Sequence, residues 1–385
     1  MRALFVTGTL GYGGAEGHSI TLVNRLAGRG HECHAVYIKA GESELLERLS
    51  GAASVRGLGA TRYLDFAALR AFAAHLARLR PAVVLAANPY ALLYARLALQ
   101  RSRVRAALAV SFHTTVPLHA KERLQLACYR PLFWTADCLV LVCEAQRRYW
   151  RRRMLWAKRT EVIHNGVDPE HWRPGAPQEC AAARRAAGLE EGDFVVGLCA
   201  KLRPEKNPVQ LVEAIAALRA RGIPARALLI GDGPMRGAVE ARARSAGVAR
   251  DVLITGLRQD VRPLVSACDV VVLCSVAVET FSIAALEAMA LGKPVVHSHI
   301  GGAAEMIRPG ENGFLFPVGD TQALVERLAA LAPRETRRRA GLAARATVEA
   351  RFSESAMVER YESLLLELNS ARSNRGNLRT NAPAH

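Results

Sequence analysis

Short runs of apolar, often β-branched residues alternate with longer helical patterns along the whole chain. This alternation is typical of parallel sheets covered by helices, so the sequence predicts an α/β fold. The pattern occurs twice, which predicts two doubly wound, Rossmann-like domains that face each other across a cleft at the carboxyl ends of their strands. In the first domain we expect strands at residues 3–7, 32–38, 82–86, 106–111, 138–142 and 161–164. In the second we expect strands at residues 194–199, 227–230, 252–255, 270–274, 294–297 and 313–316.

Turn-forming residues separate the two halves. Asn, Gly, Asp and Pro are concentrated at residues 165–169 and 173–177, so we expect the linker there. After Pro333 the pattern is helical to about residue 369, and the last residues are polar. The expected parts are an N-terminal domain at 1–172, a C-terminal domain at 173–350, a C-terminal helix at 351–370 that crosses back to the N-terminal domain, and a disordered basic tail at 371–385.

Composition places the chain among globular proteins. Of its 385 residues 50% are hydrophobic and 23% are charged, which excludes a disordered or fibrous protein. No apolar run reaches the roughly 18 residues of a membrane span, and the apolar start is too short for a signal peptide. The eight cysteines form no Cys-x-x-Cys pair and are read as reduced thiols. We therefore expect a cytoplasmic protein.

The positive charge is concentrated in the first half. The net charge is +17, and residues 1–175 hold 25 Lys and Arg against 12 Asp and Glu. The charge is densest at 147–159, where Trp150 and Trp156 are interleaved with arginines. This pattern favours an anionic membrane surface, with a solvated helix or nucleic acid as alternatives. We predict a peripheral protein on the inner face of the plasma membrane, with no nucleic-acid partner.

Two loops of the second half carry candidate ligand-binding residues. In residues 197–208, Lys201 and Lys206 lie between a strand end and a helix start, where cations and helix amides favour phosphate. In residues 229–234 a strand runs into a turn at Gly231, which would let a planar ring or a ribose lie against the backbone. A plain tight turn explains the second loop equally well.

The strongest motif pairs two acids across the start of a helix. Glu279 precedes the expected helix cap, which is Ser282 or Thr280, and Glu287 lies inside the helix, about 7.5 Å beyond Ser282 at 1.5 Å per residue. One carboxylate can meet a sugar while the other meets a ribose. The backbone amides of Phe281, Ser282 and Ile283 would then face a diphosphate between them.

Together these motifs resemble those of the GT-B retaining glycosyltransferases of family 4. The two acids separated by seven residues, the preceding lysine loop and the Gly-x-Gly-Pro turn all match that family's pattern. So do a glycine loop at 11–16, a histidine loop at 110–115 and an Asn-Gly-Val-Asp segment at 165–168. The resemblance spans about residues 4 to 365 and implies the GT-B fold.

The resemblance also implies roles for the residues of the second half. Glu287 would hold the nucleotide ribose, and Glu279 would contact the donor sugar. Lys201 and Lys206 would bind the diphosphate, although the family usually carries arginine where Lys201 stands. Lysine keeps the charge but lacks the planar fork of arginine, so bidentate binding is lost there.

In the first half, His113 would lie near the transferring sugar, and Gly13 and Gly14 would let backbone approach it. The implied reaction moves a hexosyl group, with retention, from a nucleotide-diphosphate sugar to a polysaccharide or lipid-linked acceptor. The chain has no Asp-x-Asp motif, and the alternating His297 and His299 are read as structural, so we predict no metal site and no cofactor. The alternatives are a non-hydrolysing nucleotide-sugar 2-epimerase, a soluble sugar-phosphate glycosyltransferase and a non-catalytic nucleotide-binding scaffold.

Overall fold

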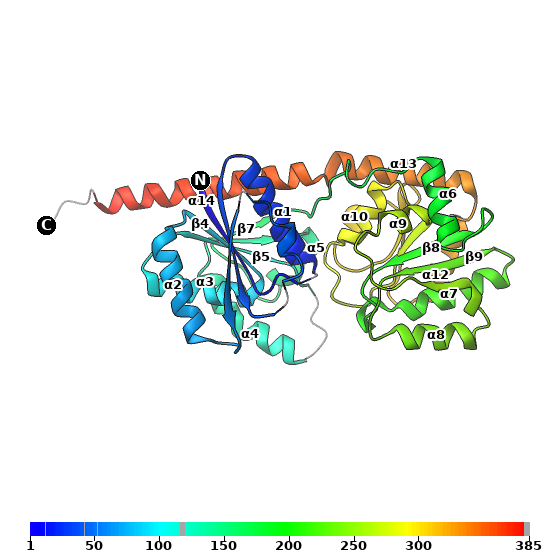
Figure 1. The fold of residues 1–385 in the computed structure, drawn as a ribbon, viewed down its shortest axis with the longest axis horizontal. Coiled ribbons are helices and arrows are strands. Elements are labelled where there is room, and N and C mark those ends of the chain that lie inside the picture. Colours follow the sequence, from blue (N-terminus) through cyan, green and yellow to red (C-terminus); the bar gives the residue numbers. More distant parts are fainter. Residues whose placement is uncertain (12, 42, 52, 116–119, 381–385) are drawn as a thin grey trace. The chain divides into compact units, whose positions relative to one another are not determined.

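The computed structural model describes all residues except 12, 42, 52, 116–119 and 381–385, and its side chains are described up to residue 372. The chain divides into two compact units. The first comprises Met1–His164 with Met357–His385, and the second comprises Asn165–Ala356. Each unit holds one parallel sheet covered by helices, which confirms the predicted pair of Rossmann-like domains (Figure 1).

The first unit is built on a seven-stranded sheet in the order β3-β2-β1-β4-β5-β6-β7. β1 lies at the centre and pairs in parallel with β2 on one side and β4 on the other. Because β1 is covered on both faces, its residues after Arg2 are all buried. The strands are β1 (Arg2–Thr7), β2 (Glu32–Lys39), β3 (Ser54–Ala60), β4 (Val83–Ala87), β5 (Ala107–Phe112), β6 (Cys138–Leu141) and β7 (Arg159–Val162).

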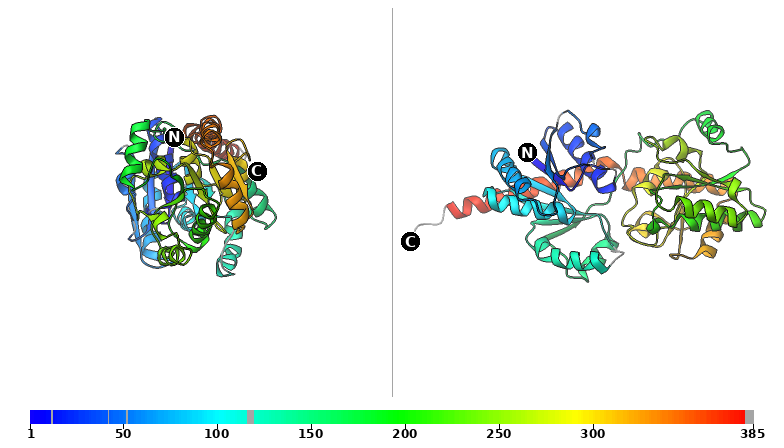
Figure 2. Two further views of the ribbon diagram at one scale, coloured as in Figure 1. Left: turned by 90° about the vertical axis from the view of Figure 1, so that its right-hand side faces the viewer. Right: turned by 60° about the horizontal axis from the view of Figure 1, so that its bottom comes forward.

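Helices cover both faces of this sheet (Figures 1 and 2). One apolar core joins the sheet to α2 (Phe66–Leu79), α3 (Asn88–Ser102), α4 (Ala120–Trp134) and α5 (Glu144–Arg151). A second core joins the opposite face to α1 (Gly14–Gly28) and α14 (Glu354–Thr380). Local sequence sets the helix ends; the Asp65 side chain, for example, accepts hydrogen bonds from the first amides of α2.

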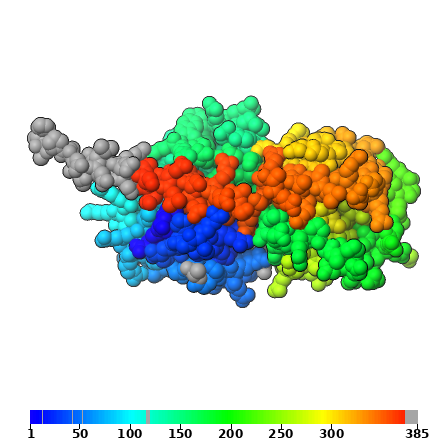
Figure 3. Space-filling view, turned by 90° about the horizontal axis from the view of Figure 1, so that it is seen from above, coloured from blue at the N-terminus to red at the C-terminus, as the bar shows by residue number. Residues whose placement is uncertain are grey.

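The C-terminal helix belongs to the core of the first unit. Tyr361 and Leu365 of α14 are fully buried against the sheet. Arg29, just after α1, forms ion pairs with Glu362 at 2.6 Å and Glu359 at 3.3 Å. Figure 3 shows α14 lying along the surface beside the N-terminal segment. The sequence predicted this return correctly, but helix α14 continues to Thr380, where a disordered tail from residue 371 was expected.

The second unit is built on a six-stranded parallel sheet in the order β10-β9-β8-β11-β12-β13. Its strands are β8 (Phe194–Cys199), β9 (Ala225–Ile230), β10 (Val252–Ile254), β11 (Val270–Leu273), β12 (Val295–Ser298) and β13 (Gly313–Phe316). A core joins one face to α7 (Pro208–Ala220), α8 (Arg236–Ser245) and α12 (Thr321–Ala330). The other helices are α6 (Pro177–Ala186), α9 (Arg262–Ala267), α10 (Ile283–Ala290), α11 (Ala303–Met306) and α13 (Arg334–Arg351).

Two features differ from the sequence-based expectation. The units divide at His164 and Asn165 rather than at residue 172, because Asn165 and Val167 bond within the second unit. β3 was missed because Ser54–Ala60 contains two glycines, and several of its side chains are exposed at the sheet edge, so no apolar run marks it.

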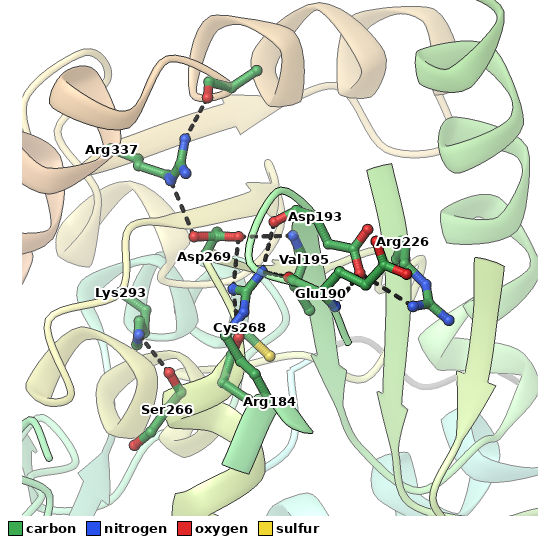
Figure 4. Close-up of polar contacts among 12 residues, drawn as sticks. Arg184, Glu190, Asp193, Val195, Arg226, Ser266, Cys268, Asp269, Lys293 and Arg337 are labelled. Atoms are coloured by element: carbon green, nitrogen blue, oxygen red, sulfur yellow. Dashed lines mark hydrogen bonds and ion pairs between the residues drawn. The ribbon is translucent and has the colours of Figure 1, made fainter. Parts of the chain in front are cut away.

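A carboxylate at the start of β11 ties several elements of the second unit together (Figure 4). Asp269 Oδ2 accepts hydrogen bonds from the Val195 amide at 2.8 Å and from Arg184 at 3.2 Å. Its Oδ1 accepts one from Arg337 Nε at 3.1 Å. Arg184 lies on α6 and Arg337 on α13, so one side chain links β8, β11 and two helices.

We predict that Asp269→Ala destabilises the second unit by about 3 kcal/mol, because it leaves two half-buried arginines and a strand amide without their acceptor. Urea unfolding followed by circular dichroism measures this loss. The matched control is Glu311→Ala, which removes an ion pair with Arg308 whose side chains are half exposed and should cost under about 1 kcal/mol. Equal losses in the two variants would contradict the prediction.

Candidate active site

Glu279 is the central carboxylate of the second unit. It lies in the loop that joins the carboxyl end of β11 to α10, and only 7% of it is exposed. Lys206 Nζ donates to Glu279 Oε2 at 2.6 Å, and Ser275 Oγ donates to the same oxygen at 2.7 Å. Lys206 comes from the short helix η2 (Pro204–Lys206), after the neighbouring strand β8. The structure thus brings together two predicted residues that are 73 positions apart in the sequence.

The surroundings keep this carboxylate ionised. Burial alone would raise the pKa of Glu279, but the charge of Lys206 and the hydrogen bonds from Lys206 and Ser275 outweigh burial, so the pKa lies below its ordinary value. Burial also lowers the pKa of His297, which therefore stays neutral. His297 Nδ1 donates to the Ser298 carbonyl at 2.7 Å, and its buried Nε2 has no partner among the described residues.

Backbone contacts fix the loop that carries Glu279. Gly302 N donates to the Thr280 carbonyl at 2.6 Å. Gly301 has a φ of 58°, and a Cβ at this position would overlap the Glu279 carbonyl, so only glycine fits there. Asn165 Nδ2 donates to the Phe281 carbonyl at 2.9 Å. Val278 has a φ of 56°, a strained conformation for a β-branched residue. These contacts hold the carboxylate in one place.

Helix α10 places the second acid. Ser282 caps the helix as predicted, since its Oγ accepts from the Ala285 amide at 3.3 Å. Glu287 is partly exposed on α10 and lies near Cys199 at the end of β8. Burial raises the pKa of the Cys199 thiol to about 12, and the charge of Glu287 contributes to this rise. A small cavity of about 30 Å³ lies among Ser282, Lys206 and the strand ends, room for about one water molecule.

The other predicted residues of this unit lie around these groups. Ile283 is the first residue of α10, and the Phe281 ring packs against Phe352 at a centroid distance of 5.3 Å. Lys201 is exposed on the loop after β8 and does not line the small cavity. Gly231 has a φ of 143°, and a side chain there would overlap the Ala200 carbonyl, so this glycine lets the two loops approach each other.

The predicted residues of the first unit lie at the carboxyl edge of its own sheet. Gly13 is the N-cap of α1, after β1, and Gly14 is the first residue of that helix. His113 directly follows β5, and its backbone amide donates to Asn88 Oδ1 at 3.1 Å. The His113 ring is half-buried, and burial lowers its pKa from 6.5 to about 4. His113 is therefore neutral at physiological pH.

The basic segment at 147–159 needs one correction. Trp150 was expected to be available to a membrane, but it is 2% exposed, packs against Phe112 and donates from Nε1 to the Thr114 carbonyl at 2.8 Å. Trp156 is 41% exposed and stacks on Trp134, also 41% exposed, at a centroid distance of 5.8 Å. The accessible aromatic pair is thus Trp134 and Trp156.

Several residues of the two sites escaped the sequence analysis. Ser275 and Asn165 are small polar residues whose roles depend on contacts distant in the sequence. His297 was noticed but read as structural. His18 of α1 packs its ring 5.0 Å from that of His113, with no motif to indicate it. Among the described residues, no three metal-ligating side chains gather at one point, and no helix is long and apolar enough to cross a membrane.

The fold and the residue sets of the two units define the GT-B architecture. Residues 12–171 match the family described as Glycosyltransferase Family 4, and residues 181–347 match Glycosyl transferases group 1. The chain therefore belongs to the GT-B glycosyltransferases of the family 4 type.

Relatives and solved structures agree with this assignment. The chain is 35% identical over 227 residues to the putative glycosyltransferase EpsD of Bacillus subtilis, covering 58% of each protein. It is 30% identical to a D-inositol 3-phosphate glycosyltransferase of Corynebacterium urealyticum, over 55% of this chain and 52% of that one. The chain spans about half the length of these curated relatives. Anabaena HepE in complex with UDP has the same fold, with a TM-score of 0.84, 23% identity, and coverage of 95% of this chain and 100% of that one.

The lowered pKa of His113 predicts a pH dependence of stability. Between pH 6.5 and about 4 the unfolded chain binds a proton at this residue that the folded chain does not, so stability falls as pH falls through this window. The unfolding temperature of His113→Gln should therefore fall less between pH 7 and pH 5 than that of the wild type. Scanning calorimetry at the two pH values measures this, with the exposed His171→Gln as control. An equal loss in wild type and His113→Gln would contradict the assigned shift.

Proposed function

We propose that the protein is a retaining glycosyltransferase that moves a hexosyl group from a nucleotide-diphosphate sugar to an acceptor hydroxyl. The observation that carries this proposal is the buried Glu279 carboxylate, paired with Lys206 beside the N-terminus of α10. Glu287 follows inside the same helix. An acid for the sugar and an acid for the ribose thus lie on one short stretch of the second unit, and a cation for phosphate is paired with the first acid from a neighbouring loop.

The donor nucleotide is assigned to the second unit. The helix dipole favours negative charge at the N-terminal end of α10. Phe281 and Ser282, just before the helix, and Ile283, its first residue, place their backbone amides at that end and would donate to the diphosphate. Structures of Anabaena HepE with UDP, and with UDP-glucose, support a uridine nucleotide as the first donor to test.

The chemistry asked of these groups is mainly electrostatic. As the bond between sugar and phosphate breaks, positive charge develops on the sugar and negative charge on the leaving diphosphate. Lys206 and the amides at the start of α10 stabilise the negative charge, and the exposed Lys201 adds a second cation. The Lys206 ammonium has three N–H donors, so it can hold Glu279 and still donate to a phosphate oxygen. Ionised Glu279 is suited to accept a hydroxyl hydrogen bond from the sugar.

The first unit contributes His113 and the glycines before α1. A neutral imidazole can accept or donate a hydrogen bond to a sugar hydroxyl without adding charge to the site. Gly13 and Gly14 leave backbone atoms accessible at the carboxyl edge of the sheet. With a cation and helix amides available for the diphosphate, the reaction needs no divalent metal and no cofactor.

Two kinds of acceptor fit the family, and they differ in whether a membrane takes part. The basic first half favours a growing polysaccharide or a lipid-linked sugar at the inner face of the plasma membrane. Relatives named D-inositol 3-phosphate glycosyltransferase favour a soluble sugar phosphate as the second candidate. A 2-epimerase would release an altered nucleotide sugar without any acceptor, and a scaffold would bind nucleotide without turnover.

We predict that the wild type slowly hydrolyses one nucleotide sugar out of a panel of such donors. This hydrolysis should continue when EDTA removes divalent metal ions. Glu287→Ala should bind the corresponding nucleoside diphosphate about tenfold or more weakly, because a carboxylate hydrogen bond to a ligand is worth roughly 1.5–3 kcal/mol. Glu279→Gln should keep that affinity and lose turnover. Titration calorimetry and product analysis separate the two effects.

Lysine variants provide the matched control for this site. Lys206→Ala should lose most turnover, whereas Lys201→Arg should be tolerated because it keeps the charge and adds a planar fork. Turnover of Lys206→Ala within threefold of wild type would count against the diphosphate site. Unchanged nucleotide affinity in Glu287→Ala would refute the ribose role, and an EDTA loss that manganese restores would refute metal independence.

An exposed patch of the first unit suits the proposed membrane surface. We define the tryptophan patch as Trp134, Met154 and Trp156, which are 41%, 55% and 41% exposed. Trp134 Nε1 donates to the Met154 carbonyl at 3.3 Å, so the three residues form one surface. The exposed Arg151, Arg152 and Arg153 adjoin it. Tryptophan rings favour the headgroup region of a bilayer, and arginines are attracted to anionic lipids.

We predict that the protein sediments with vesicles containing an acidic lipid and is partly released by salt, because exposed charges are screened over about 8 Å at physiological ionic strength. Changing Arg151, Arg152 and Arg153 to Gln should weaken binding at low salt. Changing Trp134 and Trp156 to Ala should remove the part that persists at high salt.

The matched control changes Arg244, Arg250 and Arg258 to Gln, which removes the same charge from exposed positions of the second unit. These variants should bind vesicles as the wild type does. If the wild type ignores anionic vesicles at low salt, the membrane proposal is wrong and the soluble sugar-phosphate acceptor is favoured. Binding to duplex DNA, measured in parallel, shows whether the protein is attracted to any polyanion rather than to lipid.

A further inference from the structure

His18 is a buried histidine of the first unit that touches the predicted active-site histidine. It lies in the second turn of α1, four residues after Gly14, and is 4% exposed. The centroid of its ring lies 5.0 Å from that of His113, with the planes at 63°. On its other side it meets Tyr361 of α14 at 5.3 Å and 62°. The three rings thus form an edge-to-face stack from the C-terminal helix to His113.

The polar atoms of this stack are not explained by packing. His18 Nε2 and the Tyr361 hydroxyl are buried and have no hydrogen-bond partner among the described residues. Burying such groups without partners costs free energy, which leucine at either position would avoid. The aromatic rings are therefore present for something other than apolar volume.

The His18 ring that contacts His113 is uncharged. Burial lowers the pKa of His18 well below its ordinary value, and the proximity of His113 lowers it further. His18 is therefore neutral, so it presents His113 with an uncharged ring at fixed distance and angle. The His113 backbone is held separately by Asn88, so the His18 ring acts on the side chain.

We propose that His18 is a positioning residue for His113: its ring fixes the orientation of the His113 imidazole toward the sugar, and Tyr361 supports His18 from behind. The inference rests on the proposed glycosyl transfer. The proposal also gives α14 a function in the site, because Tyr361 of this helix forms the end of the ring stack that positions His113. His18 itself touches no substrate.

The experiment compares two variants of similar size. His18→Phe keeps an aromatic ring, and His18→Leu keeps apolar volume without one. With the panel sugar that the wild type hydrolyses, His18→Leu should lower kcat about tenfold, since a misplaced group costs up to 100-fold per ångström. His18→Phe should restore kcat to within threefold. The affinity for UDP should stay unchanged in both, because the nucleotide is assigned to the other unit.

A second readout does not depend on activity. In protein labelled at histidine, the ring resonances of His113, assigned with His113→Gln, should shift in His18→Leu and much less in His18→Phe. Ser19→Ala, a buried polar change on the same helix whose hydroxyl bonds to the Ala15 carbonyl, is the control and should move neither kcat nor these resonances. If His18→Leu does not fold, Tyr361→Leu against Tyr361→Phe makes the same comparison.

The outcomes distinguish the two proposals. Unchanged His113 resonances in His18→Leu, or full turnover in that variant, would overturn the positioning role even if the enzyme transfers sugar. A wild type that turns over no nucleotide sugar would overturn the proposed function, and the resonances would still decide whether His18 orients His113. A loss of kcat in His18→Phe as large as in His18→Leu would mean that the ring stack is not what matters.

Discussion

The ion pair between Glu279 and Lys206 is the interaction on which the arrangement of the second unit's site depends. A carboxylate that is 7% exposed needs a compensating charge and hydrogen bonds, and Lys206 and Ser275 supply them at 2.6 and 2.7 Å. Each partner is itself held: Ser298 Oγ donates to the Ser275 carbonyl at 2.7 Å, and Val276 donates to the Glu205 carbonyl at 2.9 Å. The charge pair thereby fixes the loops after β8, β11 and β12 to one another.

This constraint explains why the strain lies where it does. Val278 adopts a positive φ one residue before Glu279, and Gly301 is packed against the carbonyl of Glu279 itself. Glycine adopts a positive φ without strain, but the conformation of Val278 would not persist in a loop free to relax. Because the loop cannot relax, α10 begins at a fixed place and its first amides point in a fixed direction. A site that stabilises charge in a transition state benefits from such preorganisation, since no reorganisation is needed during reaction.

The sequence alone predicted most of the fold, and it singled out Glu279, Ser282 and Glu287 of the second unit, whose roles stay predictions. Strands of parallel sheets are buried on both faces and read as apolar runs, so twelve of the strands were expected from pattern, whereas the glycine-containing edge strand β3 was not. Glu279, Ser282 and Glu287 lie within nine residues, so helix geometry alone related them. Ser275, His297 and His18 could not be found this way, because their roles depend on neighbours brought in by the fold.

The two sites differ in how they hold their key side chain, and this difference follows from charge. Glu279 is ionised, so the second unit pairs it with the Lys206 cation and the Ser275 hydroxyl group. His113 is neutral, so the first unit can hold it with rings, which provide shape and orientation but little charge. A ring stack needs firm support, and here the support is α14, whose apolar face completes the core beneath α1. Helix α14 therefore helps to determine the position of His113, which lies 248 residues before Tyr361. It also supplies part of the core of the first unit, so residues 1–164 cannot complete that core alone.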